Sequence, residues 1–587
     1  MKRHSTVARA ALALVLGAWC CVFLACGGGN SPPPANKAAA PANPTPSTPA
    51  AEAKNEIPTP PGALELVMAY GSEKEKWVNA TTAAFNAAGP TLKSGKPIFV
   101  RTLPMGSGEC IDGVLSGDVK AHLVSPASSA FIELGNAQAR AKGGQNLVAS
   151  TQNLVLSPVV IAIWKPMAEA LGFGKKPIGW SDIQSLATND KGWASFDQAQ
   201  WGKFKFGHTH PEYSNSGLIA VLAQVYAANG KTSGLSLTDV EKPETGKYLG
   251  DIQKAVVHYG SSTGFFGRKM FANGPEYLSA AVLYENMVIE ANTPDPKTGQ
   301  LPTLPVVAIY PKEGTFWSDH PAGVVEREWV TDEHREAAKQ YLDFLLARPQ
   351  QEQALAFGFR PAEVDIKLTA PFDAEHGVDP KEPKTTLEVP KADVMNAIIR
   401  LWREHKKKAN IVLVFDTSGS MQQENKIGAA RDGAAELVRL LGDDDTFSLL
   451  PFNNQLNWSL QDASIRENRT QALSRVQSLF PQGGTALYDA IAAAYARQET
   501  NPQPDRITAI VVLTDGADTN STLKLPALLD RIHFDPEKHH TRIFTIGYGS
   551  DAQQGVLEKI SDATQAKAFV GTTKNIRQVF KDISTFF

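Results

Sequence analysis

The sequence lacks a strong excess of either charge. Lysine and arginine number 58, aspartate and glutamate number 61, and the formal net charge is −3. A chain with such balance has no large basic surface, and this excludes nucleic acid as the expected partner. The 587 residues, 42% of them hydrophobic, suffice for several well-cored globular domains.

The sequence also lacks a long apolar run beyond its first 26 residues. No later stretch reaches the ~18 consecutive apolar residues of a membrane-spanning helix, so no such helix is expected. Other enzyme motifs are missing as well: we find no H-E-x-x-H, Walker A or G-x-G-x-x-G pattern. The acidic triplet at 443–445 lies in a predicted helix–strand turn and is interpreted as solvated. These absences favour a binding protein that is not an enzyme.

Cysteine is scarce, with four in the whole chain. Cys20 and Cys21 fall in an N-terminal segment whose basic residues precede an apolar stretch, which is typical of a signal peptide. The stretch ends Phe23-Leu24-Ala25-Cys26, and it resembles the lipobox of bacterial lipoproteins. The resemblance implies cleavage after residue 25 and a lipid on Cys26; an ordinary signal peptide is the alternative. Cys110 would then be the only free thiol, which excludes an intrachain disulfide.

The sequence divides into five predicted segments. They are a signal peptide at 1–25, a tether at 26–61, a first domain at 62–365, a linker with a short helix at 366–408 and a second domain at 409–587. The tether is rich in Gly, Pro, Ala, Ser and Thr and cannot bury enough surface to fold. Its prolines favour an extended conformation that holds the domains away from a membrane. The lysine run at 406–408 is interpreted as a solvated connector.

The second domain begins with an apolar strand at 411–415, and Asp416-Thr417-Ser418-Gly419-Ser420 and an amphipathic helix follow it. Asp-x-Ser-x-Ser thus lies at the carboxyl end of a buried strand, where open α/β sheets bind ligands. Thr485 follows two glycines on a later loop, and Asp515 follows the apolar strand at 510–514. Carboxylate and hydroxyl oxygens suit Mg²⁺, Mn²⁺ or Ca²⁺. The predicted metal site therefore consists of Asp416, Ser418, Ser420, Thr485 and Asp515.

This set of residues resembles the metal-ion-dependent adhesion site of the von Willebrand factor A family, and all five positions match. The resemblance covers residues 409–587. It implies that Ser418 and Ser420 bind the ion directly, that Asp416 and Asp515 act largely through water, and that Thr485 does either. It also implies Mg²⁺ as the first choice of ion, with a protein partner whose carboxylate completes the coordination. A domain of this fold with an inactive site is the alternative.

The first domain alternates predicted strands and helices, which indicates a parallel α/β sheet. Its organisation and the segment at 357–362 resemble type 2 periplasmic solute-binding proteins, the receptors of ABC importers. The resemblance implies two α/β lobes with a ligand in the cleft between them. The apolar strands at 159–164 and 305–310 would carry the chain out to the second lobe and back.

Three polar loops of this domain are predicted to line the cleft. Their candidate ligand contacts are Ser107, Ser128, Ser214 and Ser216. Hydroxyls and backbone N–H groups at a helix N-terminus form an anion site, so an oxyanion is one expected solute. Helix capping is the alternative role of Ser214 and Ser216.

Together these features predict an α/β protein of the bacterial cell envelope, in which a two-lobed solute-binding-like domain precedes a doubly wound, mostly parallel A-type domain. The leading hypothesis is a binding protein that engages a protein partner through a divalent cation, with the two-lobed domain capturing a small solute or serving as a scaffold. The membrane is contacted through the lipid anchor alone. The alternative is the receptor of an ABC-type importer with an accessory A-type domain. Hydrolysis that depends on Asp515 would instead indicate an enzyme.

Overall fold

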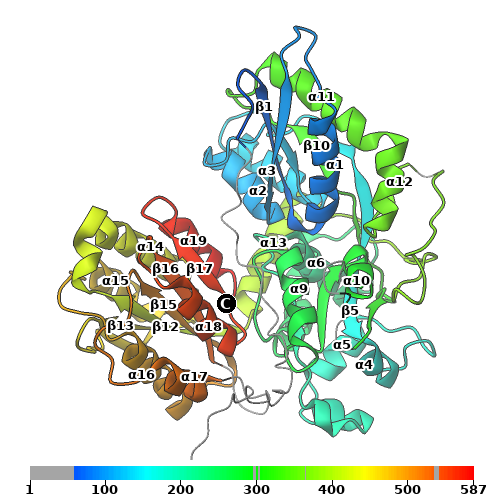
Figure 1. Ribbon diagram of the computed structural model, residues 1–587. Helices are drawn as coiled ribbons and strands as arrows, with labels where there is room; N and C mark the ends of the chain where they lie inside the picture. Colours follow the sequence, from blue (N-terminus) through cyan, green and yellow to red (C-terminus); the bar gives the residue numbers. More distant parts are fainter. Residues whose placement is uncertain (1–57, 295–298, 300, 302–303, 364, 534–540) are drawn as a thin grey trace, which may run out of the picture. The chain divides into compact units, whose positions relative to one another are not determined.

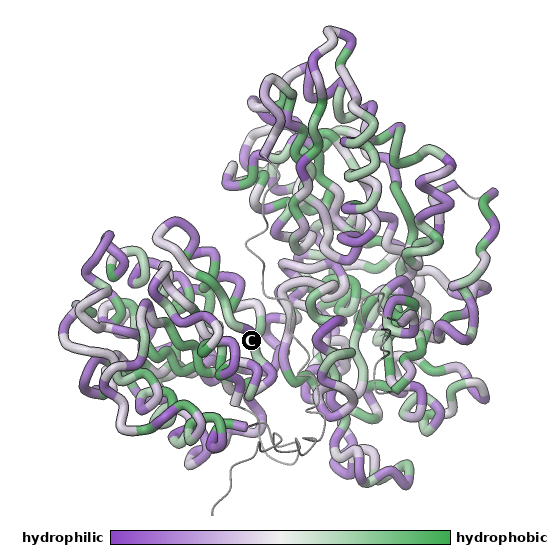
Figure 2. The backbone as a smooth tube through the Cα atoms, viewed as in Figure 1, coloured by the Kyte–Doolittle hydropathy of each residue, from purple (hydrophilic) through white to green (hydrophobic). Residues whose placement is uncertain are grey.

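The computed structural model describes residues 58–587 except 295–298, 300, 302–303, 364 and 534–540. The predicted signal peptide, Cys26 and nearly all of the predicted tether lie outside the described residues. Three β-sheets organise the described part of the chain (Figure 1), and hydrophobic residues concentrate along their strands (Figure 2). No helix in this part is long and apolar enough to cross a membrane.

The first lobe is formed by two stretches of the chain, from 64 to 153 and from 321 to 356. Its elements are β1 (Leu64–Gly71), η1 (Ser72–Lys74), α1 (Glu75–Ala87), β2 (Ile98–Met105), α2 (Ser107–Ser116), β3 (Leu123–Ser125), α3 (Ser129–Ala141), β4 (Gln152–Asn153), β10 (Pro321–Val324), α11 (Asp332–Leu346) and α12 (Arg348–Ala356). The sheet has the order β2-β1-β3-β10-β4, with β1 parallel to β2 and β3. Buried residues of β1, including Leu66 and Met68, pack in one cluster with Tyr341 of α11.

The second lobe has a sheet of six strands, and β5 pairs with four of the others. Its elements are β5 (Val155–Trp164), α4 (Lys165–Ala170), α5 (Trp180–Ala187), η2 (Gly192–Phe196), η3 (Ala199–Trp201), β6 (Phe206–Gly207), α6 (Asn215–Asn229), α7 (Leu237–Val240), α8 (Pro243–Gln253), α9 (Thr263–Asn273), β7 (Ala280–Tyr284), α10 (Glu285–Ala291), β8 (Val306–Ile309), β9 (Trp317–Ser318), β11 (Arg360–Pro361) and α13 (Ala392–His405). The apolar α6 is buried along most of its length, as a helix that is hydrophobic on all sides should be.

The chain passes between the lobes at positions other than those predicted. The segments at 159–164 and 305–310 do not carry the crossings, because both lie within the second sheet as parts of β5 and β8. The chain passes outward between β4 and β5 and returns between β9 and β10. The prediction was wrong because the crossings are made next to two-residue strands, which leave no hydrophobic pattern in the sequence.

The helix predicted in the linker is α13, and it packs against the second lobe. Its buried face includes Met395, Ile398 and Trp402 and lies against α6, α7 and α8. The lysine run after it is not a solvated connector, because these side chains are half-buried and burial lowers the pKa of Lys406. Asp445 of the acidic triplet is also buried, and it accepts the Ala409 N–H at 2.7 Å.

The C-terminal domain is a six-stranded sheet with helices on both faces. Its elements are β12 (Lys408–Asp416), η4 (Gly419–Asn425), α14 (Lys426–Leu440), β13 (Thr446–Phe452), β14 (Leu460–Ser464), α15 (Ile465–Gln477), α16 (Leu487–Thr500), β15 (Arg506–Thr514), α17 (Leu525–Ile532), β16 (Thr541–Tyr548), α18 (Gln554–Ala563), β17 (Ala568–Gly571) and α19 (Ile576–Ser584). The order is β14-β13-β12-β15-β16-β17, and all pairs are parallel except β13 with β14.

Alternate residues of the two central strands bury opposite faces of this sheet. Val412 and Val512 pack with α16, α17 and α18, whereas Leu413 and Val511 pack with α14, α15 and α19. Strands buried on both sides are continuous apolar runs, which explains the sequence pattern at 411–415 and 510–514. The predicted doubly wound, mostly parallel α/β fold is confirmed.

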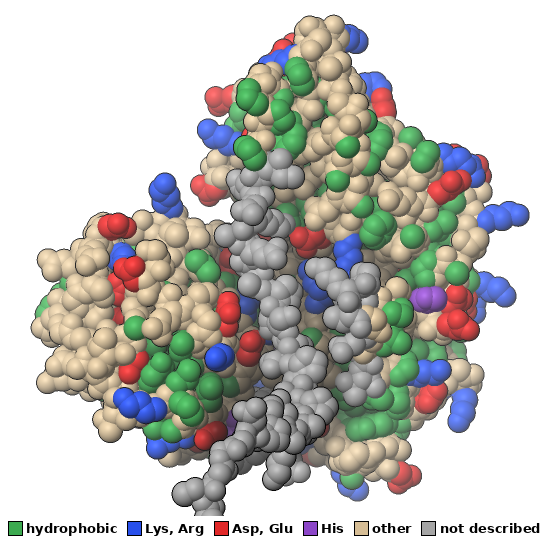
Figure 3. Space-filling view, viewed as in Figure 1, with side chains coloured by type: hydrophobic (Ala, Val, Ile, Leu, Met, Phe, Trp, Pro, Cys, Tyr) green, Lys and Arg blue, Asp and Glu red, His purple; other side chains and the backbone are tan. Residues whose placement is uncertain are grey.

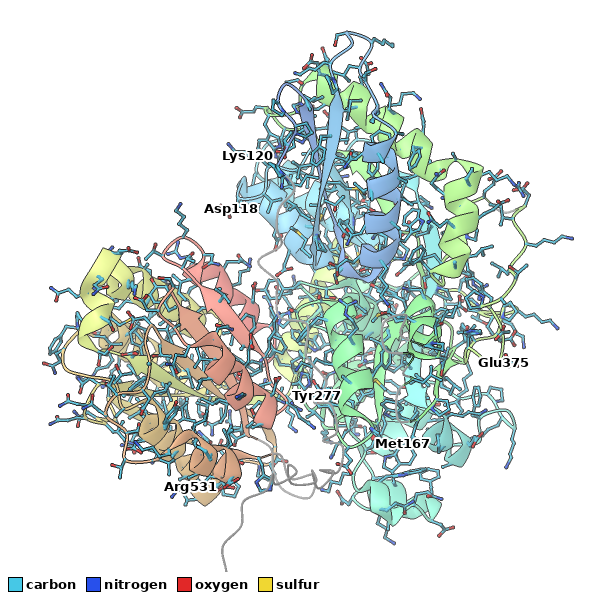
Figure 4. All side chains as sticks on the ribbon, viewed as in Figure 1. Asp118, Lys120, Met167, Tyr277, Glu375 and Arg531 are labelled. Carbon is cyan, nitrogen blue, oxygen red and sulfur yellow. The ribbon has the colours of Figure 1, made fainter. Side chains whose placement is uncertain are left out.

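Charged side chains of both signs are interspersed over the face shown in Figure 3, in keeping with the balanced composition. A typical exposed loop joins α2 to β3, where Figure 4 labels Asp118 and Lys120. Asp118 accepts the Ser116 hydroxyl at 2.8 Å, so this acid belongs to a local turn.

Candidate functional site

The Asp-x-Ser-x-Ser loop follows β12, one of the two central strands of the C-terminal sheet. Asp416 is completely buried and both its oxygens accept protein donors: Oδ1 takes the Ser418 N–H at 2.7 Å and Oδ2 takes the Thr514 hydroxyl at 2.6 Å. Burial raises the pKa of Asp416 to about 6, although these hydrogen bonds oppose the shift. The carboxylate is thus held in place with too little positive charge around it, a condition that a cation would relieve.

Two serine hydroxyls lie beside this carboxylate and connect it to the neighbouring strand. Ser418 Oγ and Ser420 Oγ are 3.0 Å apart, and the Ser420 hydroxyl donates to Asp515 Oδ1 at 2.7 Å. Asp515 directly follows β15, which is parallel to β12, so the two acids meet at the same edge of the sheet. A continuous series of hydrogen bonds therefore joins four of the five predicted metal-site residues.

The loop that carries Thr485 is held against the first loop by backbone hydrogen bonds. Gly419 N–H donates to Gly483 O at 3.0 Å, and Gly483 has a φ of +74°, which glycine adopts without strain. Thr485 N–H donates to Thr519 Oγ1 at 3.0 Å and to Asn520 Oδ1 at 3.2 Å. Thr485 is thereby positioned from both sides, by the first loop and by the loop after Asp515.

Sequence reasoning missed one member of this site, Lys426. Its side chain is 7% exposed and its Nζ lies 2.9 Å from Asp515 Oδ2. The first residue of an amphipathic helix is normally solvated, so the sequence alone gave no reason to single it out. Glu424 and Asn425 precede it with φ values of +50° and +56°, and this left-handed turn directs the chain so that the lysine enters the site.

The donor set of the site is mostly hydroxyl oxygen. Among the described residues, no group of three or more His, Cys, Asp or Glu side chains is placed to hold a metal ion. A cation at the C-terminal sheet edge would therefore depend on Ser418, Ser420 and Thr485 beside two carboxylates. Such donors fit a hard divalent ion and do not fit a soft one.

The four serines predicted to contact a solute are all buried and hydrogen-bonded within the protein. Ser107 Oγ accepts the Ala127 N–H at 2.9 Å, and Ser128 Oγ accepts the Ala130 N–H at 3.2 Å as the N-cap of α3. These bonds fix the polar loops of the first lobe. A contact of either hydroxyl with a solute stays a prediction.

Ser214 and Ser216 lie at the start of α6, and neither caps the helix with its side chain in the predicted way. Ser214 Oγ is 3.1 Å from Thr263 Oγ1, and Ser216 Oγ is 2.8 Å from Thr209 Oγ1. Thr209 Oγ1 accepts the Gly217 N–H at 2.8 Å and so caps the first turn. The hydroxyls join α6 to α9 and to the loop that leads into the helix.

The two lobes meet through their backbones next to these loops. Gly108 N–H donates to Tyr213 O at 2.9 Å. A Cβ on Gly108 would lie 2.0 Å from Glu212 O, far inside the contact distance, so only glycine permits this approach. The two lobes are therefore in direct contact at this point.

A buried ion pair lies at the end of β1, where the first lobe faces the second. Lys74 Nζ is 2.8 Å from Glu73 Oε1, 3.1 Å from Ser125 O and 3.2 Å from His320 Nδ1. Burial and the nearby Lys74 lower the pKa of His320 to about 4, so the ring is neutral at pH 7. Burial alone would raise the pKa of Glu73, but Lys74 and His320 hold it at about 2. The acid is thus ionised and paired.

Several buried polar atoms around this pair have no hydrogen-bond partner among the described residues. They are Ser72 Oγ, Ser125 Oγ, Asn215 Oδ1 and His320 Nε2. Asn215 belongs to the second lobe, and its Nδ2 donates to Tyr284 Oη at 3.1 Å; the Tyr284 ring lies 5.9 Å from that of His320. Buried polar atoms are normally satisfied, so this interlobe cluster has unused capacity for a polar molecule.

Residues 410–584 match the family of von Willebrand factor type A domains. The chain contains an A-type domain. Residues 154–379 match the family described as bacterial extracellular solute-binding protein, so the A-type domain follows a solute-binding-protein-like domain. The second match indicates an extracytoplasmic location. Both family descriptions concern binding modules.

The A-type domain is also similar to curated animal proteins. It is 30% identical over 158 residues to inter-alpha-trypsin inhibitor heavy chain H4 of Sus scrofa, which is 26% of this chain and 17% of that protein. It is 25% identical over 192 residues to heavy chain H2 of Mesocricetus auratus, or 30% of this chain and 20% of that protein. The chain thus spans about a fifth of the length of these relatives.

Solved structures resemble each domain separately. A von Willebrand factor type A protein from Catenulispora acidiphila has 24% identity and a TM-score of 0.27, covering 31% of this chain and 42% of that one. A periplasmic thiamin binding protein has 13% identity and a TM-score of 0.42, covering 58% of this chain and 96% of that one.

Proposed function

We propose that this protein is an extracytoplasmic binding protein, lipid-anchored through Cys26, whose A-type domain binds a divalent cation and through it a protein partner. Ser418 and Ser420 would hold the ion, with Thr485, Asp416 and Asp515 around them. Mg²⁺ is the expected ion, with Mn²⁺ or Ca²⁺ as alternatives. The ion would supply an electrophilic position that a carboxylate of the partner completes.

One observation carries this proposal: two serine hydroxyls lie 3.0 Å apart between two buried acids, at the carboxyl ends of the central strands. The raised pKa of Asp416 adds support, because a buried carboxylate with too little compensating charge favours a cation nearby. Both acids are already fixed by protein donors, which leaves the hydroxyls as direct ligands.

Calorimetric titration of MgCl2 into the full chain tests the proposal. We expect saturable binding of one ion per chain, and a loss of affinity of about 10- to 100-fold in Asp416→Asn, as for other groups that orient metal ligands. Asp444→Asn, an exposed acid outside the site, is the matched control and should bind as the wild type does. Equal binding, or equal absence of binding, in the wild type and Asp416→Asn would reject the metal-dependent mechanism.

A second function, capture of a small polar solute by the two-lobed domain, is favoured by the interlobe cluster. Four atoms lack partners among the residues that the structure describes, and they offer both donors and acceptors to a polar ligand: Ser72 Oγ, Ser125 Oγ, Asn215 Oδ1 and His320 Nε2. This function would make the protein the receptor of an ABC-type importer with an accessory A-type domain.

Thermal-shift screening of oxyanions and small polar solutes on the full chain tests this second function. A solute at 100 times its Kd should stabilise the domain by about 2.7 kcal/mol through mass action. Asn215→Leu removes one of the acceptors and should abolish the shift, whereas the exposed Asn396→Leu should retain it. No shift with any solute in a broad panel would contradict solute capture.

A further inference from the structure

Lys426 enters the metal site from a fixed position. It is the first residue of α14, and its backbone carbonyl accepts the Tyr548 hydroxyl at 3.0 Å. A Cβ on Gly549 would lie 3.2 Å from Lys426 Cε and 3.3 Å from its Nζ, so the lysine lies against bare backbone. The ammonium therefore has little freedom to leave Asp515.

The ammonium changes the charge of the site. Lys426 contributes one positive charge, which offsets one of the two negative charges of Asp416 and Asp515. A divalent cation bound beside these three groups gives a site with a net positive charge. Without the lysine the same loaded site would be neutral.

The positive charge of Lys426 has opposite effects on the metal ion and on the partner's anion. It repels the incoming metal ion, because like charges at short range in a poorly hydrated environment interact strongly. It attracts an anion at the open coordination position of the bound ion, for the same reason. A neutral side chain of similar size would remove both effects, so that the metal ion would bind more tightly and the anion more weakly.

We propose that Lys426 is a built-in counter-cation that weakens metal binding and makes the loaded site selective for an anionic, carboxylate-bearing partner. This inference rests on the proposed metal site and adds the role of a residue that the five-ligand pattern does not contain. Lys426 is a positioning and charge-setting residue and not a ligand, because an ammonium group has no acceptor for a metal.

A purely structural role for Lys426 makes a different prediction. If the lysine only holds Asp515 in place, its removal lets the acid move and weakens metal binding. If it is a counter-cation, its removal strengthens metal binding and weakens carboxylate binding. The two roles therefore differ in sign, and the test does not depend on any activity of the protein.

The test uses the full chain with Lys426→Met and Lys426→Gln, and Lys559→Met as an exposed control. Calorimetry with MgCl2 should give an affinity on the order of tenfold tighter in both Lys426 variants than in the wild type, corresponding to about 1.4 kcal/mol. Carboxylate binding is then measured with sodium acetate on the Mn²⁺-loaded chain, because acetate that displaces metal-bound water lowers the water proton relaxation rate. Both variants should need several-fold more acetate than the wild type.

Unchanged or weaker Mg²⁺ affinity in both variants would overturn the inference, and so would tighter Mg²⁺ binding with unchanged acetate binding. If the wild type binds no Mg²⁺, the proposed metal function itself fails, which is a separate result. Melting curves with and without Mg²⁺ identify a variant that does not fold, and the other variant then decides.

Discussion

Lys74→Met is expected to destabilise the two-lobed domain by about 3–5 kcal/mol, the usual loss when one partner of a buried ion pair is removed. The methionine fills similar space but leaves the Glu73 carboxylate buried without its ammonium. Urea unfolding at neutral pH, followed by tryptophan fluorescence, should show that this domain unfolds at a lower urea concentration in the variant than in the wild type. The control is Lys165→Met, which changes an exposed lysine of the same two-lobed domain and should unfold as the wild type does.

The double variant Glu73→Gln/Lys74→Met should recover most of this loss, because no unpaired charge then remains. In the wild type the pKa of Glu73 is lowered to about 2, so its stabilising contribution is present above the usual glutamate pKa and is lost as the pH falls from about 4 toward 2. In Lys74→Met only His320 still opposes the effect of burial on the pKa of Glu73, so acid should reduce the difference in stability from the wild type. If Lys74→Met alone is as stable as the wild type, the paired arrangement of Glu73 and Lys74 is contradicted.

The two acids of the metal site should respond in opposite ways when metal is absent. Asp515→Asn leaves the Lys426 ammonium buried without a carboxylate, and we expect it to destabilise the A-type domain by about 3–5 kcal/mol. Asp416→Asn removes a charge that burial disfavours, and we expect it to be neutral or to stabilise the domain by up to about 2 kcal/mol. Melting temperatures in excess chelator measure both effects.

The pH dependence of stability shows whether the Asp416 carboxyl stabilises or destabilises the folded domain. Its pKa in the folded chain is raised to about 6, so the carboxyl contributes stability below the unfolded pKa of about 4, and this is lost as the pH rises through 6. The gain in Asp416→Asn should therefore be largest above pH 6 and vanish near pH 4. A strong loss of stability in metal-free Asp416→Asn, equal to that in Asp515→Asn, would mean that Asp416 has a purely structural role.

Most of the A-type fold could be predicted from the sequence because its central strands are continuous apolar runs that end in the metal-site residues. The run at 411–415 leads directly to Asp416, and the run at 510–514 leads to Asp515, so parallel pairing was enough to place both acids together. A parallel sheet buries both faces of each strand, so its central strands can be recognised in the sequence as continuous hydrophobic runs.

Lys426 and the interlobe cluster could not be predicted in the same way. The position of Lys426 depends on two left-handed residues, Glu424 and Asn425, and a glutamate rarely adopts this conformation, so the turn could not be predicted. The Lys74 cluster joins residues 246 positions apart, Lys74 and His320, and a charged helix start is normally solvated. The crossing points were misplaced because two-residue strands such as β4 carry no periodic pattern.

Mn²⁺ binding to the full chain decides whether a divalent ion rests on the hydroxyls of Ser418 and Ser420. The EPR signal of free Mn²⁺ is lost on binding, so a titration counts bound ions. We expect one Mn²⁺ per wild-type chain, displaced by Mg²⁺, and no specific binding in Ser418→Ala/Ser420→Ala, in which both carboxylates remain. Equal Mn²⁺ binding by the double variant, or none by the wild type, would contradict it.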